Sequence, residues 1–157
     1  MSTVILYSTK HGTAAKCAGI LSEKASESIQ SVNIKDFPDF HLTQYNKVIL
    51  GASVYVEKIQ KEMSAFCNKN REGLLEKEIG LFICSGDTGK AGNRYLKLFG
   101  EDLYAHSTSK KLFGSEIYWK KMNAIEKLAT RIITKSKGDT SDLEMAAMDD
   151  FVIEMKL

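Results

Sequence analysis

The residues best suited to bind a ligand form a hydroxyl-rich loop near the N-terminus, Ser8-Thr9-Lys10-His11-Gly12-Thr13. The loop follows an apolar run that ends at Tyr7, and it leads into a segment with helical periodicity. Free backbone N–H groups at a helix N-terminus attract anions, and nearby hydroxyl groups add hydrogen bonds to phosphate oxygens. The loop therefore predicts a phosphate-binding site, although Ser, Thr and Gly here could also serve only as a helix cap.

The sequence lacks the motifs of other phosphate-binding sites and of metal sites. The chain has no GxxxxGK[ST] motif, no GxGxxG motif after a strand and no acidic pair at the end of the first apolar run. The cysteines and histidines show no metal-ligand spacing, so we expect no metal site and reduced thiols. These residues are Cys17, Cys67, Cys84, His11, His41 and His106.

Length and composition indicate an ordinary globular domain. The chain has 157 residues, of which 43% are hydrophobic and 27% charged, and we expect residues 1–157 to form one domain. The net charge of +2 argues against a nucleic-acid partner. No apolar run reaches the ~20 residues that span a bilayer, and the N-terminus lacks the basic region of a signal peptide. A cytoplasmic location without a transmembrane segment is therefore expected.

Short apolar runs alternate with helical patterns along the chain. Candidate strands are residues 4–7, 32–34, 48–52, 79–84 and 112–117. The first, third and fourth are almost continuously apolar, which is typical of strands buried on both faces of a parallel sheet. Helical spacing links four sets of residues: Ala14, Ala18, Leu21 and Ala25; Ile59, Met63, Phe66 and Cys67; Tyr95, Leu96, Phe99 and Leu103; and Met122, Ile125, Ala129, Ile132 and Ile133. Residues 142–156 are helix-permissive, and their role is left open.

Strands alternating with helices predict an α/β three-layer sandwich, and five strands favour a parallel sheet in the order 2-1-3-4-5. Ligands of such sheets bind beyond the carboxyl ends of the strands, at the point where the strand order reverses. The loops after the first, third and fourth strands are therefore expected to form the site.

The two later loops carry residue types suited to a planar ligand. Ser53-Val54-Tyr55-Val56 offers Tyr55 for stacking, and an offset aromatic pair adds roughly 0.5–1.5 kcal/mol beyond area burial. Ser85-Gly86-Asp87-Thr88-Gly89 is glycine-rich, so its backbone can approach a ligand closely. A half-buried loop aromatic and an Asp-Gly turn without a ligand are the alternatives.

The first loop resembles the flavodoxin phosphate loop S-x-T-G-N-T at Ser8 and Thr13, and it differs at residues 10–12. Together with Tyr7 it more closely resembles the loop of the menaquinone-dependent protoporphyrinogen IX dehydrogenase branch of flavodoxin-like proteins. The segment 51–53, followed by Lys61 and Phe66, is similar to that branch too.

The resemblance implies a flavodoxin-like domain that binds flavin mononucleotide (FMN). Its phosphate would be held by residues 8–13, with Lys10 as a basic partner, whereas His11 is expected to face solvent. Its isoalloxazine ring would lie beside residues 53–56 and 85–89.

The same resemblance implies a redox protein in electron transfer or an oxidoreductase. The flavin carries the chemistry, so no catalytic side chain is expected. Its partner would be a redox protein, a quinone or another small-molecule electron acceptor.

One alternative is protoporphyrinogen IX dehydrogenase in heme biosynthesis, whose quinone would imply peripheral contact with a membrane. That branch implies a long insertion after the fourth strand, for which the stretch after Ser85 leaves little room. A second alternative is a flavin-free interaction module. Whether the chain is an enzyme stays open.

Overall fold

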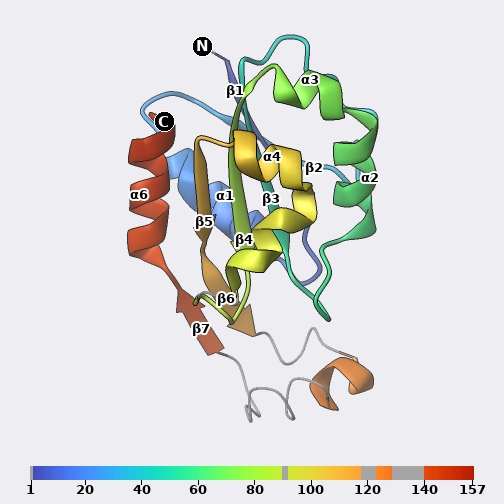
Figure 1. The fold of residues 1–157 in the computed structure, drawn as a ribbon. Coiled ribbons are helices and arrows are strands. Elements are labelled where there is room, and N and C mark those ends of the chain that lie inside the picture. Colours follow the sequence, from blue (N-terminus) through green and yellow to red (C-terminus); the bar gives the residue numbers. More distant parts are fainter. Residues whose placement is uncertain (1, 90–91, 118–122, 129–139) are drawn as a thin grey trace.

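The main sheet confirms the predicted strand order. The computed structural model describes residues 2–89, 92–117, 123–128 and 140–157. Its five parallel strands lie in the order β2-β1-β3-β4-β5 (Figure 1). Their bounds are Thr3–Tyr7 for β1, Gln30–Asn33 for β2, Lys47–Ser53 for β3, Glu78–Cys84 for β4 and Ser109–Leu112 for β5.

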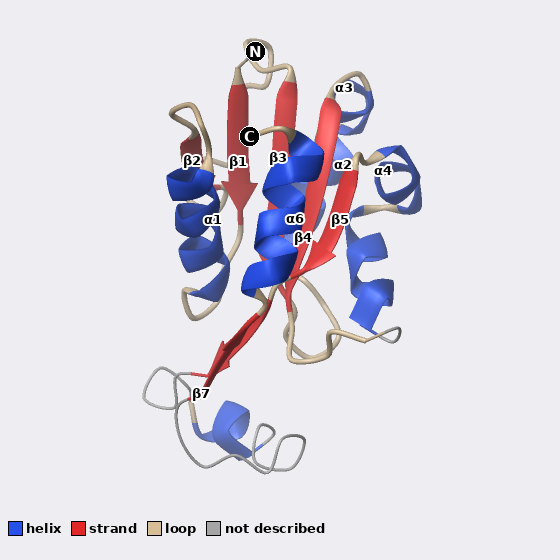
Figure 2. Ribbon diagram, turned by 90° about the vertical axis from the view of Figure 1, so that its left-hand side faces the viewer, coloured by secondary structure: helices blue, strands red, loops and turns tan. Residues whose placement is uncertain are grey.

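Helices cover both faces of this sheet and give the three layers that were expected. Figure 2 shows α1 (Thr13–Lys24) and α6 (Met145–Met155) on one face. The other face carries α2 (Lys61–Lys69), α3 (Arg71–Leu75), the 3-10 helix η1 (Gly92–Phe99) and α4 (Glu101–His106).

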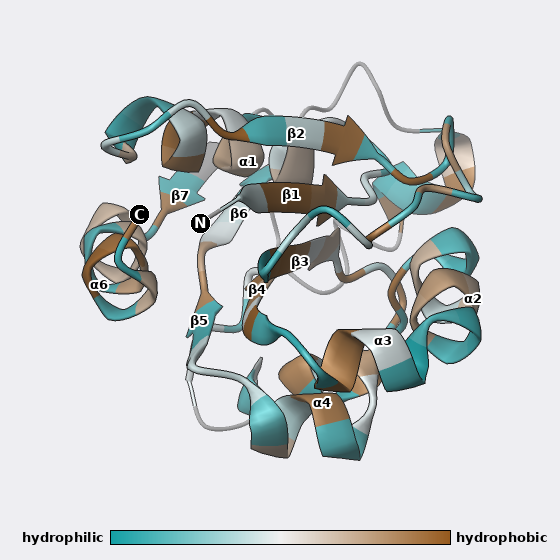
Figure 3. Cartoon of the chain, turned by 90° about the horizontal axis from the view of Figure 1, so that it is seen from above, coloured by the Kyte–Doolittle hydropathy of each residue, from teal (hydrophilic) through white to brown (hydrophobic). Residues whose placement is uncertain are grey.

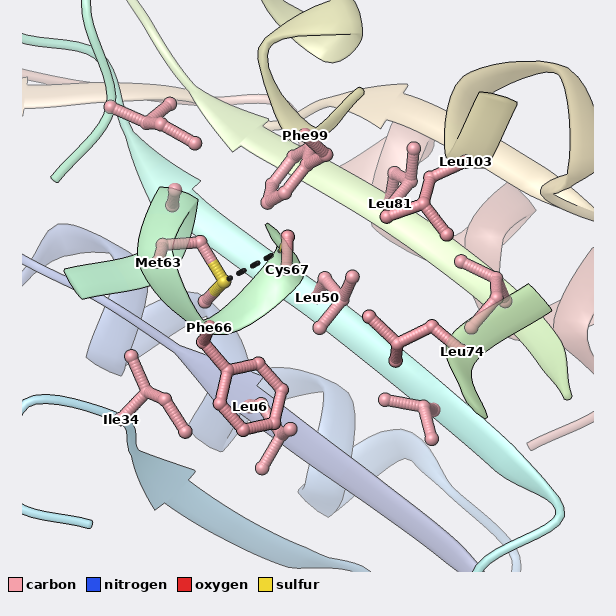
Figure 4. Close-up of a cluster of buried hydrophobic side chains, with 14 of the residues drawn as sticks. Leu6, Ile34, Leu50, Met63, Phe66, Cys67, Leu74, Leu81, Phe99 and Leu103 are labelled. Carbon is pink, nitrogen blue, oxygen red and sulfur yellow. Dashed lines mark hydrogen bonds between the residues drawn. The ribbon is translucent and has the colours of Figure 1, made fainter. Parts of the chain in front are cut away.

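Alternation along the strands builds a separate core on each face. Val4 and Leu6 belong to the cluster beneath α2, α3, η1 and α4, whereas Ile5 belongs to the cluster beneath α1 and α6. Figure 4 shows part of the first cluster, and Figure 3 shows hydrophobic residues concentrated on the central strands. In the second cluster the Phe82 ring lies against Gly51, where an added Cβ would be 1.9 Å from Phe82 Cζ. The central strands therefore match the sequence prediction of strands buried on both faces.

The expectation for residues 112–117 was wrong in part. β5 ends at Leu112, and the chain then leaves the sheet as β6 (Gly114–Ile117), which pairs antiparallel with β7 (Thr140–Leu143). Gly114 makes this departure feasible, because it has a φ of +80° and an added Cβ would be 2.0 Å from the Asp142 carbonyl oxygen. The chain thus makes an excursion from the main sheet after β5, of which β6 and β7 are the described strands.

The last helix on the sheet is α6, and not the fourth predicted helical stripe. Residues 124–128 are helical, but Ile125 is 78% exposed, so it does not pack in the core. The other members of that stripe lie outside the described residues. Met148, Phe151 and Met155 of α6 are fully buried instead. The third stripe is buried as expected, although Gly100, with a φ of +127°, separates η1 from α4.

Candidate functional site

The candidate site lies at the carboxyl edge of the sheet, where β1, β3 and β4 end. Two backbone hydrogen bonds tie the first and second loops to the ends of neighbouring strands: Ser8 N–H donates to the Gly51 carbonyl of β3 at 2.9 Å, and Val54 N–H donates to the Cys84 carbonyl of β4 at 3.0 Å. A larger cavity of about 790 Å³ lies at the opposite edge, near the first residues of β1, β2 and β3. Parallel α/β sheets bind ligands at the carboxyl edge, so strand polarity and not cavity size locates the site.

The N-terminus of α1 follows directly on the first loop. Gly12 is the N-cap residue with a φ of 97°, and no side chain of the described residues makes a cap hydrogen bond to the helix. The Thr9 hydroxyl oxygen accepts a hydrogen bond from Gly12 N–H at 2.9 Å, which shapes the loop before the helix begins. The first turn of α1 has no acidic residue that could neutralise its positive end. A simple side-chain cap therefore does not account for the hydroxyl residues of this loop.

Gln60 connects the first loop to the second, and sequence reasoning missed it. The buried Ser8 hydroxyl donates to Gln60 Oε1 at 2.8 Å. Gln60 Nε2 donates to the Ser53 carbonyl at 3.0 Å. A single glutamine before a helix has no distinctive spacing, so its role follows only from the loops that the fold brings together. Ser8 thus positions the loop through Gln60.

Glu126 lies against the basic residues of the first loop and was also not predicted. Its carboxylate bonds to His11 Nε2 and lies 3.2 Å from Lys10 Nζ. Although burial raises the carboxyl pKa, hydrogen bonds from His11 and Lys10 hold the pKa of Glu126 below its ordinary value. The expectation that His11 faces solvent was wrong, because its side chain is only 19% exposed and is paired with Glu126.

Tyr55 lies directly beside the first loop. Lys10 Nζ is 3.6 Å from the centroid of the Tyr55 ring, a distance that gives a cation–π interaction. A cavity of about 350 Å³ adjoins this ring. Its lining residues are Lys10, Tyr55, Val56, Lys58, Ile59 and Gln60. The first and second loops are therefore brought together as the sequence predicted.

A tight reversal with unusual backbone geometry follows Tyr55. Tyr55 N–H donates to the Lys58 carbonyl at 2.8 Å, and Lys58 N–H donates to the Tyr55 carbonyl at 3.1 Å. Val56 and Glu57 between them have φ values of 48° and 58°. A β-branched residue in this region is strained, and such strain is held where the surrounding structure determines it. The turn fixes Tyr55 at the edge of the cavity.

Ser53, at the end of β3, has a buried polar atom without a partner in the part of the chain that the structure describes. This atom is the hydroxyl oxygen of its side chain. Buried hydroxyl groups are nearly always satisfied, so an unpaired one needs an explanation such as an absent ligand or water. Val54, the next predicted residue, contributes its backbone N–H to the bond with Cys84.

The third loop is open and held by its own side chains. Ser85 is buried, and its hydroxyl oxygen accepts from Asp87 N–H at 3.1 Å. Asp87 Oδ1 accepts from Gly89 N–H at 3.2 Å. Residues 86–89 are exposed at the same edge as the other loops. This loop therefore includes the Asp-Gly turn that the sequence suggested, and it leaves the backbone of Gly86 accessible.

Comparisons with known proteins agree with this architecture. Residues 4–144 match the family described as Flavodoxin domain. No curated protein sequence matches the chain significantly. No helix within the described ranges is long and apolar enough to cross a membrane.

Several solved structures share the fold at low identity. An apo-form NADH:FMN oxidoreductase has 11% identity and a TM-score of 0.56, with 99% of this chain and 90% of that chain covered. A short-chain flavodoxin associated with a non-canonical PDU bacterial microcompartment has 18% identity, a TM-score of 0.54 and coverage of 87% and 100%. The Trp repressor binding protein from Bacillus subtilis has 12% identity, a TM-score of 0.50 and coverage of 86% and 99%. Because the family match spans nearly the whole chain and the sheet has the matching strand order, the chain belongs to the flavodoxin-domain family.

Proposed function

We propose that the chain binds FMN at the carboxyl edge of the sheet and works as a flavodoxin-like redox protein, in electron transfer or as an oxidoreductase. The main support is the position of Lys10, which belongs to the phosphate-type loop and lies on the face of the Tyr55 ring. One residue thus joins the two features that FMN requires, an anion site and an aromatic platform.

The residues present fit this cofactor. The uncapped start of α1, with Lys10 beside it, suits a phosphate. The unpaired Ser53 hydroxyl offers a hydrogen bond to a ligand, and Tyr55 offers a ring face. The proposed cofactor-binding residues are Ser8, Thr9, Lys10, His11, Gly12 and Thr13 in the first loop, Ser53, Val54, Tyr55 and Val56 in the second, and Ser85, Gly86, Asp87, Thr88 and Gly89 in the third. When bound, FMN supplies the redox chemistry through its isoalloxazine ring.

In this proposal the chain's own residues bind and orient the cofactor. Thr9 and Gly12 shape the loop that meets the phosphate, and Ser8 acts through Gln60 to keep that loop beside the second one. Tyr55 is held in place by its paired bonds with Lys58. The partners we propose are a redox protein, a quinone or another small-molecule acceptor, met in the cytoplasm by a single domain.

Absorption spectroscopy tests the proposal. We expect the purified protein, with or without added FMN, to show the visible bands of a bound flavin after gel filtration. Tyr55→Ala is expected to weaken FMN binding by about tenfold, because the lost stacking contact is worth about 1 kcal/mol or more. Phe37→Ala is the matched control, since Phe37 is an exposed aromatic residue distant in sequence from the three loops. Absence of any saturable FMN binding would remove the proposal.

A second candidate function is protoporphyrinogen IX dehydrogenase with a quinone acceptor. This branch implies a long insertion after β4, whereas the chain leaves the main sheet after β5. The observation in favour of this candidate is the contact of Glu126, which follows β6, with Lys10 of the first loop. Glu126 thus lies beside the proposed flavin site, where a large substrate could be engaged. Flavin-loaded protein would be assayed for protoporphyrinogen oxidation with menaquinone, and a lack of turnover would favour an electron carrier.

A further inference from the structure

We propose that Glu126 is an internal anion of the cofactor site, which pairs with the basic residues of the first loop until a phosphate monoester replaces it. This inference rests on the proposed function, because the phosphate in question is that of FMN. It assigns Glu126 a specificity role: it determines how strongly the site distinguishes phosphorylated from unphosphorylated flavin.

The burial and charge of Glu126 show why its carboxylate must be paired. The side chain is only 4% exposed, and burying a carboxylate is costly unless it is paired. Its partners among the described residues include both basic side chains of the loop, Lys10 and His11. A carboxylate from a distant part of the chain is therefore placed at the end of the loop nearest to the uncapped start of α1.

Lys10 contacts both Glu126 and the ring of Tyr55. Its ammonium group lies 3.2 Å from Glu126 and 3.6 Å from the Tyr55 ring centroid. One lysine therefore covers the proposed stacking face while it pairs with Glu126. If a phosphate takes the place of the carboxylate, Lys10 can follow the new anion and leave the face of Tyr55 free. Anion exchange and access to the ring are thus coupled through a single side chain.

The consequence is a competition that affects FMN and riboflavin differently. FMN brings a phosphate of nearly two negative charges, which must displace Glu126 or meet its repulsion. Riboflavin has no phosphate and does not require the exchange. Removal of the Glu126 charge should therefore favour FMN selectively.

The test measures FMN and riboflavin affinities of the flavin-free protein, Glu126→Gln and Glu126→Ala at fixed ionic strength. Both variants are expected to bind FMN about tenfold more tightly, since a charge-assisted hydrogen bond no longer has to be broken, with riboflavin changed by less than about threefold. Glu154→Gln is the matched control, because Glu154 pairs with Lys111 at 2.8 Å between α6 and β5. Unchanged or weaker FMN binding in both Glu126 variants overturns the inference, because Glu126 would then merely position Lys10 and His11.

A second readout separates this inference from the proposed function. Inorganic phosphate is titrated into the wild-type protein and Glu126→Gln, and the NMR amide signals of Gly12 and Thr13 are followed. Saturable shifts in the variant with weaker shifts in the wild type support the internal anion even if no form binds flavin. Equal responses in the two proteins overturn it. Failure of all forms to bind FMN or riboflavin contradicts only the proposed function.

Discussion

Replacement of Lys10 by methionine should distinguish the contribution of phosphate binding from that of stacking on Tyr55. Lys10 has two competing roles, since it can bind the phosphate of FMN, yet it covers the Tyr55 ring at 3.6 Å. A hydrogen bond to a charged group contributes about 1.5–3 kcal/mol, and the lower end applies because Lys10 is 38% exposed. We therefore expect Lys10→Met to weaken FMN binding by about tenfold.

Riboflavin should respond in the opposite way or not at all. The variant removes a cation–π contact of about 0.5–2 kcal/mol that riboflavin would otherwise have to displace from the Tyr55 ring. Its affinity should stay unchanged or rise, so the ratio of the two affinities changes more than either one alone. Isothermal titration of both flavins measures this ratio, with Lys69→Met, a change to an exposed ion-paired lysine on α2, as the control. An equal loss for both flavins would refute a phosphate role for Lys10.

Three further predictions concern stability and are measured by urea unfolding. Gly51→Ala should lower the free energy of unfolding by about 1–3 kcal/mol, because the new methyl group would overlap the Phe82 ring; an unchanged midpoint would show that the ring can move. Val56→Asn should raise it by about 0.5–1 kcal/mol, since asparagine tolerates positive φ better than valine, and a decrease would mean that the turn is not strained. Hydrogen bonds from Lys111 and Ser109 lower the pKa of Glu154 in the folded state, so its stabilising effect relative to Glu154→Gln should be present at neutral pH and disappear as pH falls through that lowered pKa. A difference that instead grows on acidification would contradict this assignment.

The three inner strands β1, β3 and β4, and the edge of the sheet where the site lies, were predictable because their sequence signals are local. Three nearly continuous apolar runs mark β1, β3 and β4, and such runs are typical of strands buried on both faces of a parallel sheet. Once the parallel order is known, the polarity of the strands brings the loops after β1 and β3 together. The contact between Lys10 and Tyr55 is a direct consequence of that order.

The excursion after β5 was not predictable by the same reasoning. Residues near Ile125 and the segment of α6 show similar helical spacing, and either could have covered the sheet. The choice is made by long-range packing: Phe151 meets Phe113 with ring centroids 5.4 Å apart, and Phe113 stacks on Phe82 at 4.8 Å. Such an aromatic cluster joins residues far apart in sequence, so periodicity alone cannot reveal it.

The roles of Gln60 and Glu126 were missed for a related reason. Each acts on the first loop from a distant part of the chain, Gln60 through Ser8 and Glu126 through Lys10 and His11. Neither residue belongs to a motif with a fixed spacing. Residues that position a binding loop, or that pair with its basic side chains, can therefore be identified only from the tertiary structure.

Mapping FMN binding by NMR tests the central claim most directly. Isotope-labelled protein is titrated with FMN, and the backbone amide signals are followed at both edges of the sheet. The proposal predicts saturable changes at Gly12, Ser53 and Gly86, with Thr3 and Gln30 at the opposite edge unaffected. Changes confined to the opposite edge, or no saturable change anywhere, would contradict it.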